Sequence, residues 1–153
     1  MAYIEGTWDF GSTAITTSNT ATVSTNVTDE GSAKKVFAGA TSTKIKGQVK
    51  LSAGSGTLSI RAQFVGADDA GLSTNAEVLA DTGIHLTKED GTTALANTDT
   101  FRFQLTPSDQ RSPKRYYGMI YTLGGTSPSA TCDGRLVIDG QTNMQGARAA
   151  VPA

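Results

Sequence analysis

The chain has 153 residues, a formal net charge of −1 and 17 Gly, and only 18% of its residues are charged. This length suits one domain over residues 1–153, and a chain dominated by Thr, Ser, Ala and Gly favours strands and turns over helices. The 13 basic residues are scattered, so no basic stripe for nucleic acid is visible. One Cys and one His exclude an intramolecular disulfide and a zinc site, and Cys132 is expected to be buried.

The N-terminal region predicts an extended segment over residues 1–28. Its first ten residues lack the basic and apolar parts of a secretory signal, and no apolar run in the chain could span a bilayer. We therefore expect a protein that is made in the cytoplasm, or released from there by other means, with no membrane partner. Trp8 and Phe10 share a face and predict a strand that ends at Gly11. Thr13–Val27 has few apolar residues, which is typical of an edge strand or of an arm ordered by a partner.

The clearest alternation in the chain covers Lys44–Leu51, whose lysines face outward. A second alternating run, Thr57–Val65, follows the Gly-containing segment Ser52–Gly56. Two such runs around a short loop predict a β-hairpin. Further along, Glu77–Leu86 is either a short strand or a helical turn, and Lys88–Asn97 is rich in turn residues. Phe101, Phe103 and Leu105 alternate with polar residues and predict another strand.

The segment Arg115–Asp139 predicts two long strands joined by a polar Gly/Ser/Pro connection. The first strand is apolar on both faces, which is typical of a central strand or of one packed against a second protein. Tyr117, Met119 and Tyr121 are placed in the core, while Tyr116 and Ile120 lie on the other face. Residues 140–153 form a small-residue tail that is either flexible or ordered against a neighbour.

Together these elements predict an all-β, single-domain antiparallel jelly roll or β-sandwich, with an extended N-terminal arm and a C-terminal tail. No constellation of catalytic residues is convincing. Asp81–Thr82–Gly83 matches the loop of an aspartic protease but lacks a suitable context, and the lone His85 is interpreted as structural. Asp29–Glu30 and Asp68–Asp69 lack the spacing of a calcium loop. We therefore expect no enzyme, no cofactor and no metal.

Two segments carry a resemblance to a known family. Thr13–Gly31 resembles the N-terminal portion of capsid cement proteins of tailed phages, of the Bordetella-phage type, and Arg115–Gln141 is similar to their C-terminal strand pair. The stretch GTLSIRAQFVGADDAGLSTNAEVLADTG between them also fits the family's order of strand, loop and short acidic segment.

This resemblance implies a structural protein of the virion that sits on the capsid exterior, assembled in the host cytoplasm. Its partners would be the major capsid protein and further copies of itself, as a homodimer or homotrimer, and it would stabilise the shell by bridging capsid subunits. The alternative is a virion-surface jelly roll that binds a carbohydrate or a receptor, because aromatic side chains on a sheet also stack on sugars. The candidate interface residues are Tyr3, Ile4, Trp8, Phe10, Tyr116 and Ile120.

Overall fold

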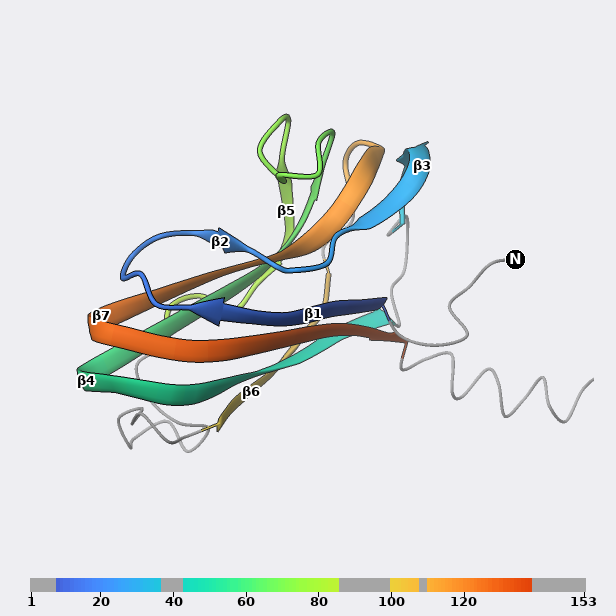
Figure 1. Cartoon of the computed structure of the whole chain (residues 1–153). Helices are drawn as coiled ribbons and strands as arrows, with labels where there is room; N and C mark the ends of the chain where they lie inside the picture. Colours follow the sequence, from blue (N-terminus) through green and yellow to red (C-terminus); the bar gives the residue numbers. More distant parts are fainter. Residues whose placement is uncertain (1–7, 37–42, 86–99, 108–109, 139–153) are drawn as a thin grey trace, which may run out of the picture.

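The structure, a computed structural model, describes residues 8–36, 43–85, 100–107 and 110–138. In these ranges the chain forms seven strands and no helix (Figure 1). The strands are β1 (Trp8–Ile15), β2 (Thr22–Val23), β3 (Thr28–Lys34), β4 (Thr43–Ala67), β5 (Glu77–Asp81), β6 (Thr100–Leu105) and β7 (Lys114–Ile138). Every strand pair is antiparallel, and the sheet forms a sandwich. The predicted all-β antiparallel sandwich is confirmed.

Two strands of 25 residues, β4 and β7, form the frame of the sandwich. They pair with each other from Thr43 opposite Ile138 to Ala67 opposite Tyr116. The register shifts three times between Leu51 and Ser59, and both strands bend sharply there (Figure 1). Shifts of this kind are irregularities that increase the local bend of a strand. One half of each strand therefore lies in one layer, and the other half lies in the second layer.

The remaining strands extend these two halves. In the first layer, β1 pairs with the C-terminal half of β7, and β6 pairs with the N-terminal half of β4, which gives the order β1–β7–β4–β6. In the second layer, β2 and β3 pair with the N-terminal half of β7, and β5 pairs with the C-terminal half of β4. Each layer thus has two central strands that it shares with the other layer.

The long frame corrects two predictions about connections. The predicted hairpin of Lys44–Leu51 and Thr57–Val65 is wrong, because both runs belong to β4 and pair with β7 instead of with each other. The two strands predicted within Arg115–Asp139 are likewise one strand, which ends at Ile138. In both cases the Gly- and Ser-containing stretch is the bend between layers. A glycine-rich stretch suits a bend as well as a turn, so composition alone favours neither.

The N-terminal region crosses from one layer to the other. β1 runs on to Ile15, beyond the expected end at Gly11, and the chain then turns at Asn19, whose φ is 54°. From there it continues to β2 on the second layer. Backbone hydrogen bonds from Asn19 to Leu123 and from Ser24 to Met119 attach this crossing to β7. Residues 8–28 of the predicted N-terminal segment are therefore part of the sandwich edge.

The core lies between the layers and is built from the inward residues of both. Phe10 of β1 faces Phe64 in the second half of β4, with ring centroids 5.8 Å apart. Tyr117, Met119, Tyr121 and Cys132 are fully buried, as predicted. Burial raises the pKa of the Cys132 thiol to about 12, which keeps it protonated and unreactive at neutral pH.

Two neighbouring glycines make room for large side chains in this core. Gly47 of β4 lies opposite Gly134 of β7 in the first layer. The ring of Phe103 occupies the space where a Gly47 side chain would be, and the hydroxyl of Tyr121 does the same at Gly134. Protein interiors are close-packed, so a side chain at either position has to displace an aromatic group.

The two buried tyrosines differ in how their hydroxyls are satisfied. The Tyr117 hydroxyl donates to the Lys34 carbonyl and accepts from the Gln110 side chain at 2.6 Å. The Tyr121 hydroxyl is buried and has no hydrogen-bond partner among the described residues. Burial raises the pKa of both phenols, and more strongly that of Tyr121. A buried polar group without a partner costs about 1–3 kcal/mol.

This difference predicts opposite effects for the same substitution. Tyr121→Phe removes an unsatisfied hydroxyl and is expected to raise the free energy of unfolding by about 1 kcal/mol. Tyr117→Phe removes two hydrogen bonds, one to the Lys34 carbonyl and one from the Gln110 side chain, so it is expected to lower that free energy by about 1–2 kcal/mol. Urea denaturation of both variants and of the wild type measures the two changes in the free energy of unfolding. Destabilisation by Tyr121→Phe equal to that by Tyr117→Phe would show that the Tyr121 hydroxyl is satisfied.

A polar cluster closes one end of the sandwich. Glu77, at the start of β5, is nearly buried and accepts hydrogen bonds from the backbone N–H groups of Arg111 and Ser112 at 2.8 and 3.2 Å. The Ser112 hydroxyl adds a third bond to the same carboxylate. Beside it, the buried Gln110 side chain donates to the Ser112 carbonyl and accepts from the Val36 N–H. One carboxylate thus fastens the loop that leads into β7.

Candidate functional site

The outward face of the first layer collects basic side chains from three adjacent strands. Along β4, lysines alternate with buried residues and point out of the sandwich, as the sequence predicted. Arg102 of β6 pairs with Gln48, and Arg135 of β7 pairs with Lys46. We call this outward surface of β1–β7–β4–β6 the basic face. Its charged side chains are Lys44, Lys46, Lys50, Arg102, Arg135, Asp9 and Asp133.

The charge on the basic face differs from that of the chain. Five basic and two acidic side chains give it a balance of +3, while the whole chain has a net charge of −1. Lys46 lies directly opposite Arg135, which places two positive charges side by side on neighbouring strands.

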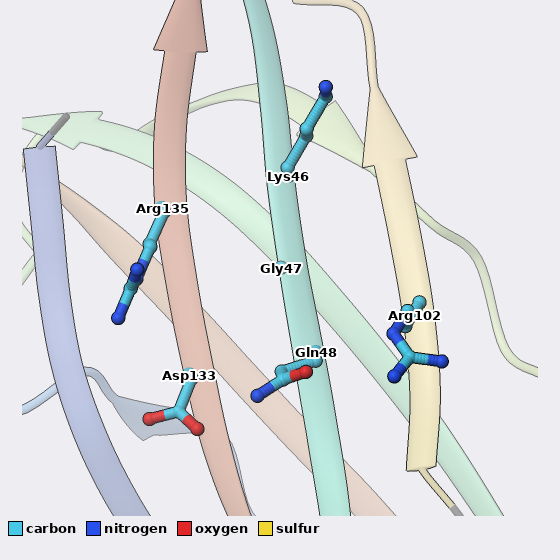
Figure 2. Close-up of a pocket in the computed structure, with 6 residues that line it drawn as sticks. All are labelled: Lys46, Gly47, Gln48, Arg102, Asp133 and Arg135. Carbon is cyan, nitrogen blue, oxygen red and sulfur yellow. The ribbon is translucent and has the colours of Figure 1, made fainter. Parts of the chain in front are cut away.

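A depression of about 340 Å³ lies in the basic face, across β7, β4 and β6 (Figure 2). Figure 2 shows Asp133 and Gln48 together on one side of Gly47, with Lys46 on the other side. Arg135 and Arg102 flank the central strand from its two neighbours. The lining residues are Lys46, Gly47, Gln48, Arg102, Asp133 and Arg135.

The charged groups around the depression are weakly engaged with one another. Arg135 approaches Asp9 at 3.9 Å, and both side chains are more than half exposed, so solvent screens this pair. The Asp133 carboxylate accepts a hydrogen bond from the Ser12 hydroxyl. Arg102 has no hydrogen bond or ion pair within the described ranges of the chain and is exposed. Its guanidinium therefore presents its donors to solvent.

The outward face of the second layer is arranged differently. There Arg61 forms two hydrogen bonds with Asp81, at 3.1 and 2.5 Å, and Arg115 forms two with Asp29, at 2.7 and 3.0 Å. These arginines are the main reason why the pKa values of Asp81 and Asp29 lie below the ordinary value. These two arginines are thus paired with carboxylates, whereas Arg102 of the basic face has no such partner among the described residues.

The candidate interface residues do not come together at one place. Phe10 is only 1% exposed and lies in the core, so its side chain is inaccessible to a partner. Trp8 packs against that core, with its ring 6.0 Å from that of Tyr117. Tyr116 and Ile120 lie on the opposite side of the sandwich, partly covered by a small apolar cluster of the same chain, built around Val65, Ala67 and Leu72. Tyr3 and Ile4 lie outside the described residues.

The possible catalytic groups are held in structural contacts. Asp81 pairs with Arg61 and also accepts the backbone N–H of Gly83, which makes Asp81–Thr82–Gly83 a turn. The side chain of His85 contacts the Thr82 carbonyl at 2.7 Å, and its backbone bridges to Ile60. These contacts fit the structural interpretation of both motifs.

The acidic pairs have local partners as well. Asp69 accepts the N–H groups of Thr74 and Ser73, which lower its pKa to about 2, and so caps the loop after β4. Over the described part of the chain, no group of three or more His, Cys, Asp or Glu is placed to hold a metal ion. The same residues include no helix with the length and apolar character needed to cross a membrane.

The sequence predicted that side chains of the basic face point outward, but it did not predict that these side chains lie next to one another. Lys44, Lys46 and Lys50 were predicted to face outward, and Arg102 and Arg135 occupy outward positions of their alternating strands. Arg102 and Arg135 are brought to the two sides of β4 only by strand pairing. The signal was the alternation itself, which marks outward positions but not which strands are neighbours.

Comparison with known proteins gives one match. A family model described as Dr-family adhesin matches residues 14–145. A search of curated proteins and a search of solved structures each returned no match.

This match corrects the interpretation drawn from the resemblance to phage proteins. Assignment to the capsid cement family is wrong, since the matching family consists of adhesins. The capsid-stabilising function, the major capsid protein as partner and the location on a virion are wrong with it. The shared letters were mostly Thr, Ser, Gly and Tyr in alternating strands, which many β-sandwiches use for the same packing reasons. The alternative of receptor binding fits the match better.

Proposed function

Since this chain belongs to the Dr-family adhesins, we propose that it is a bacterial surface adhesin that attaches the cell to a host receptor. Its role is binding without catalysis. The family match carries this proposal, and the basic face is the surface that we assign to the receptor. A sandwich suits this task because a rigid scaffold presents a fixed array of side chains, so little ordering entropy is lost on binding.

The choice of the basic face rests on its charge. A surface with an excess of cations attracts a partner of opposite charge and speeds encounter. Arg102 in particular is exposed and without an internal carboxylate in the described ranges. Individual contacts of this kind are weak, and an adhesin gains strength because many copies on one cell engage many receptors on another.

The test uses two double variants that each remove two positive charges. Lys46→Gln with Arg102→Gln changes the basic face, whereas Lys34→Gln with Lys35→Gln changes exposed lysines at the end of β3 in the other layer. We expect the first variant to reduce binding of purified protein to cultured host cells about tenfold, and the second to leave it unchanged, as measured by flow cytometry. If the two double variants bind host cells equally well, the basic face is excluded as the receptor site.

A further inference from the structure

Resting on the proposed function and deepening it, we infer that the depression in the basic face binds a carboxylated sugar residue of a glycan. The carboxylate would lie between Arg102, Arg135 and Lys46, which surround the depression from three strands. The sugar hydroxyls would meet Gln48 and Asp133. The donors around the depression, the mixture of its polar groups and its size support this.

The first support is the chemistry of the donors. Two guanidinium groups and one ammonium group surround the depression. Guanidinium is a planar fork that matches the two oxygens of a carboxylate, and charge-assisted bonds of this type are stronger than neutral ones. Among the described residues Arg135 forms an ion pair only with Asp9, and this pair is long and solvent-exposed. An incoming carboxylate can therefore replace it at little cost.

The second support is the mixture of polar groups in the depression and the size of the depression. Gln48 offers both a donor and an acceptor, and Asp133 offers acceptors, which suits hydroxyl groups. A depression of about 340 Å³ is at the small end of ligand sites and holds a sugar residue or two. A bare polyanion such as nucleic acid would meet the carboxylates of Asp9 and Asp133 on the same face.

The inference is tested with purified protein and four soluble probes. The probes are 3′-sialyllactose, an unsulfated hyaluronan tetrasaccharide, neutral lactose and a glutamate tetrapeptide. Isothermal titration calorimetry at 50 mM salt gives the affinities, and amide NMR shifts locate the site. We expect one or both acidic sugars to bind at least tenfold more tightly than lactose and than the peptide, with shifts centred on Gln48, Arg102 and Asp133. Which acidic sugar binds distinguishes sialic acid from uronic acid as the source of the carboxylate.

The matched variants then separate this inference from the proposed function. Lys46→Gln with Arg102→Gln is expected to weaken binding of the acidic sugar at least tenfold, and Lys34→Gln with Lys35→Gln less than twofold. Raising the salt to 0.5 M is also expected to weaken binding, because charges are screened over a shorter distance. Lactose or the peptide binding as tightly as the acidic sugars would overturn the inference.

A different result would overturn the inference and leave the function intact. This would be the loss of cell binding in the Lys46/Arg102 variant when neither acidic sugar binds the wild type. Retained cell binding in that variant, with sugar binding lost, would instead contradict the receptor site and support the sugar site.

Discussion

Replacing Gly47 by alanine is expected to lower the free energy of unfolding by about 2–3 kcal/mol. A methyl group at this position would lie 2.7 and 2.8 Å from ring carbons of Phe103, closer than real contacts allow. Phe103 is itself packed on Phe101 in the core, with ring centroids 6.3 Å apart, so it has little room to move. The reduced freedom of the unfolded chain favours alanine by only about 0.4–1 kcal/mol, so the steric cost dominates.

Urea denaturation of Gly47→Ala measures this loss in the free energy of unfolding. The same substitution made in the Phe103→Leu variant tests whether the contact with Phe103 causes the loss. In Phe103→Leu the side chain is smaller, so adding Gly47→Ala is expected to cost less there than in the wild type. The difference between the two costs is the coupling between the residues. Equal costs in both backgrounds would show that Phe103 is not the source of the strain.

Replacing Glu77 by glutamine is expected to destabilise the fold by about 2 kcal/mol at neutral pH. The carboxylate accepts three hydrogen bonds from Arg111 and Ser112, and a glutamine has only one acceptor oxygen to offer. Hydrogen bonds to a charged group that is nearly buried are stronger than neutral ones. The loop that leads into β7 would lose its attachment to β5.

The same contact predicts how stability varies with pH. Burial alone would raise the pKa of Glu77, but the hydrogen bonds from Arg111 and Ser112 outweigh it and leave the pKa below the ordinary value of 4.5. A carboxyl group with a lowered pKa in the folded state stabilises the fold above its unfolded pKa and loses that contribution as the pH falls through the folded one. The difference in the free energy of unfolding between wild type and Glu77→Gln is therefore expected to have its full value at pH 7 and to become smaller below about pH 4.5. A constant difference from pH 7 to pH 3 would contradict the assignment.

Local patterns predicted much of the fold. The alternation in Lys44–Leu51 and Phe101–Leu105 identified strands and their buried faces, because side chains alternate between the two faces of a strand. Tyr117, Met119 and Cys132 are buried as predicted for the same reason. The prediction of a hairpin turn at Ser52–Gly56 was wrong, because the strand bends there from one layer into the other and does not turn back to pair with itself. That choice depends on β7, a partner far away in the sequence.

The candidate site was less predictable than the fold. Arg102 and Arg135 are distant in sequence, and each looks like an ordinary outward residue of its own strand. Only the registers of β6 and β7 against β4 bring both to the same depression. Aromatic residues attracted attention as interface candidates, yet Phe10 serves the core. A surface assembled from several strands leaves no local motif, so sequence patterns alone do not predict it.

The shared frame of the sandwich has a consequence for how the protein folds. β4 and β7 contribute to both layers, so neither layer can form fully without the other. Ala67 and Tyr116 are the paired residues of β4 and β7 that are closest in sequence, and even they are separated by all of β5 and β6. Contacts between distant residues pay their loop-closure entropy before they gain stability, and such topologies fold in milliseconds to seconds instead of microseconds. During that interval the chain exposes unpaired strand edges, which makes it prone to aggregation before the sandwich is complete.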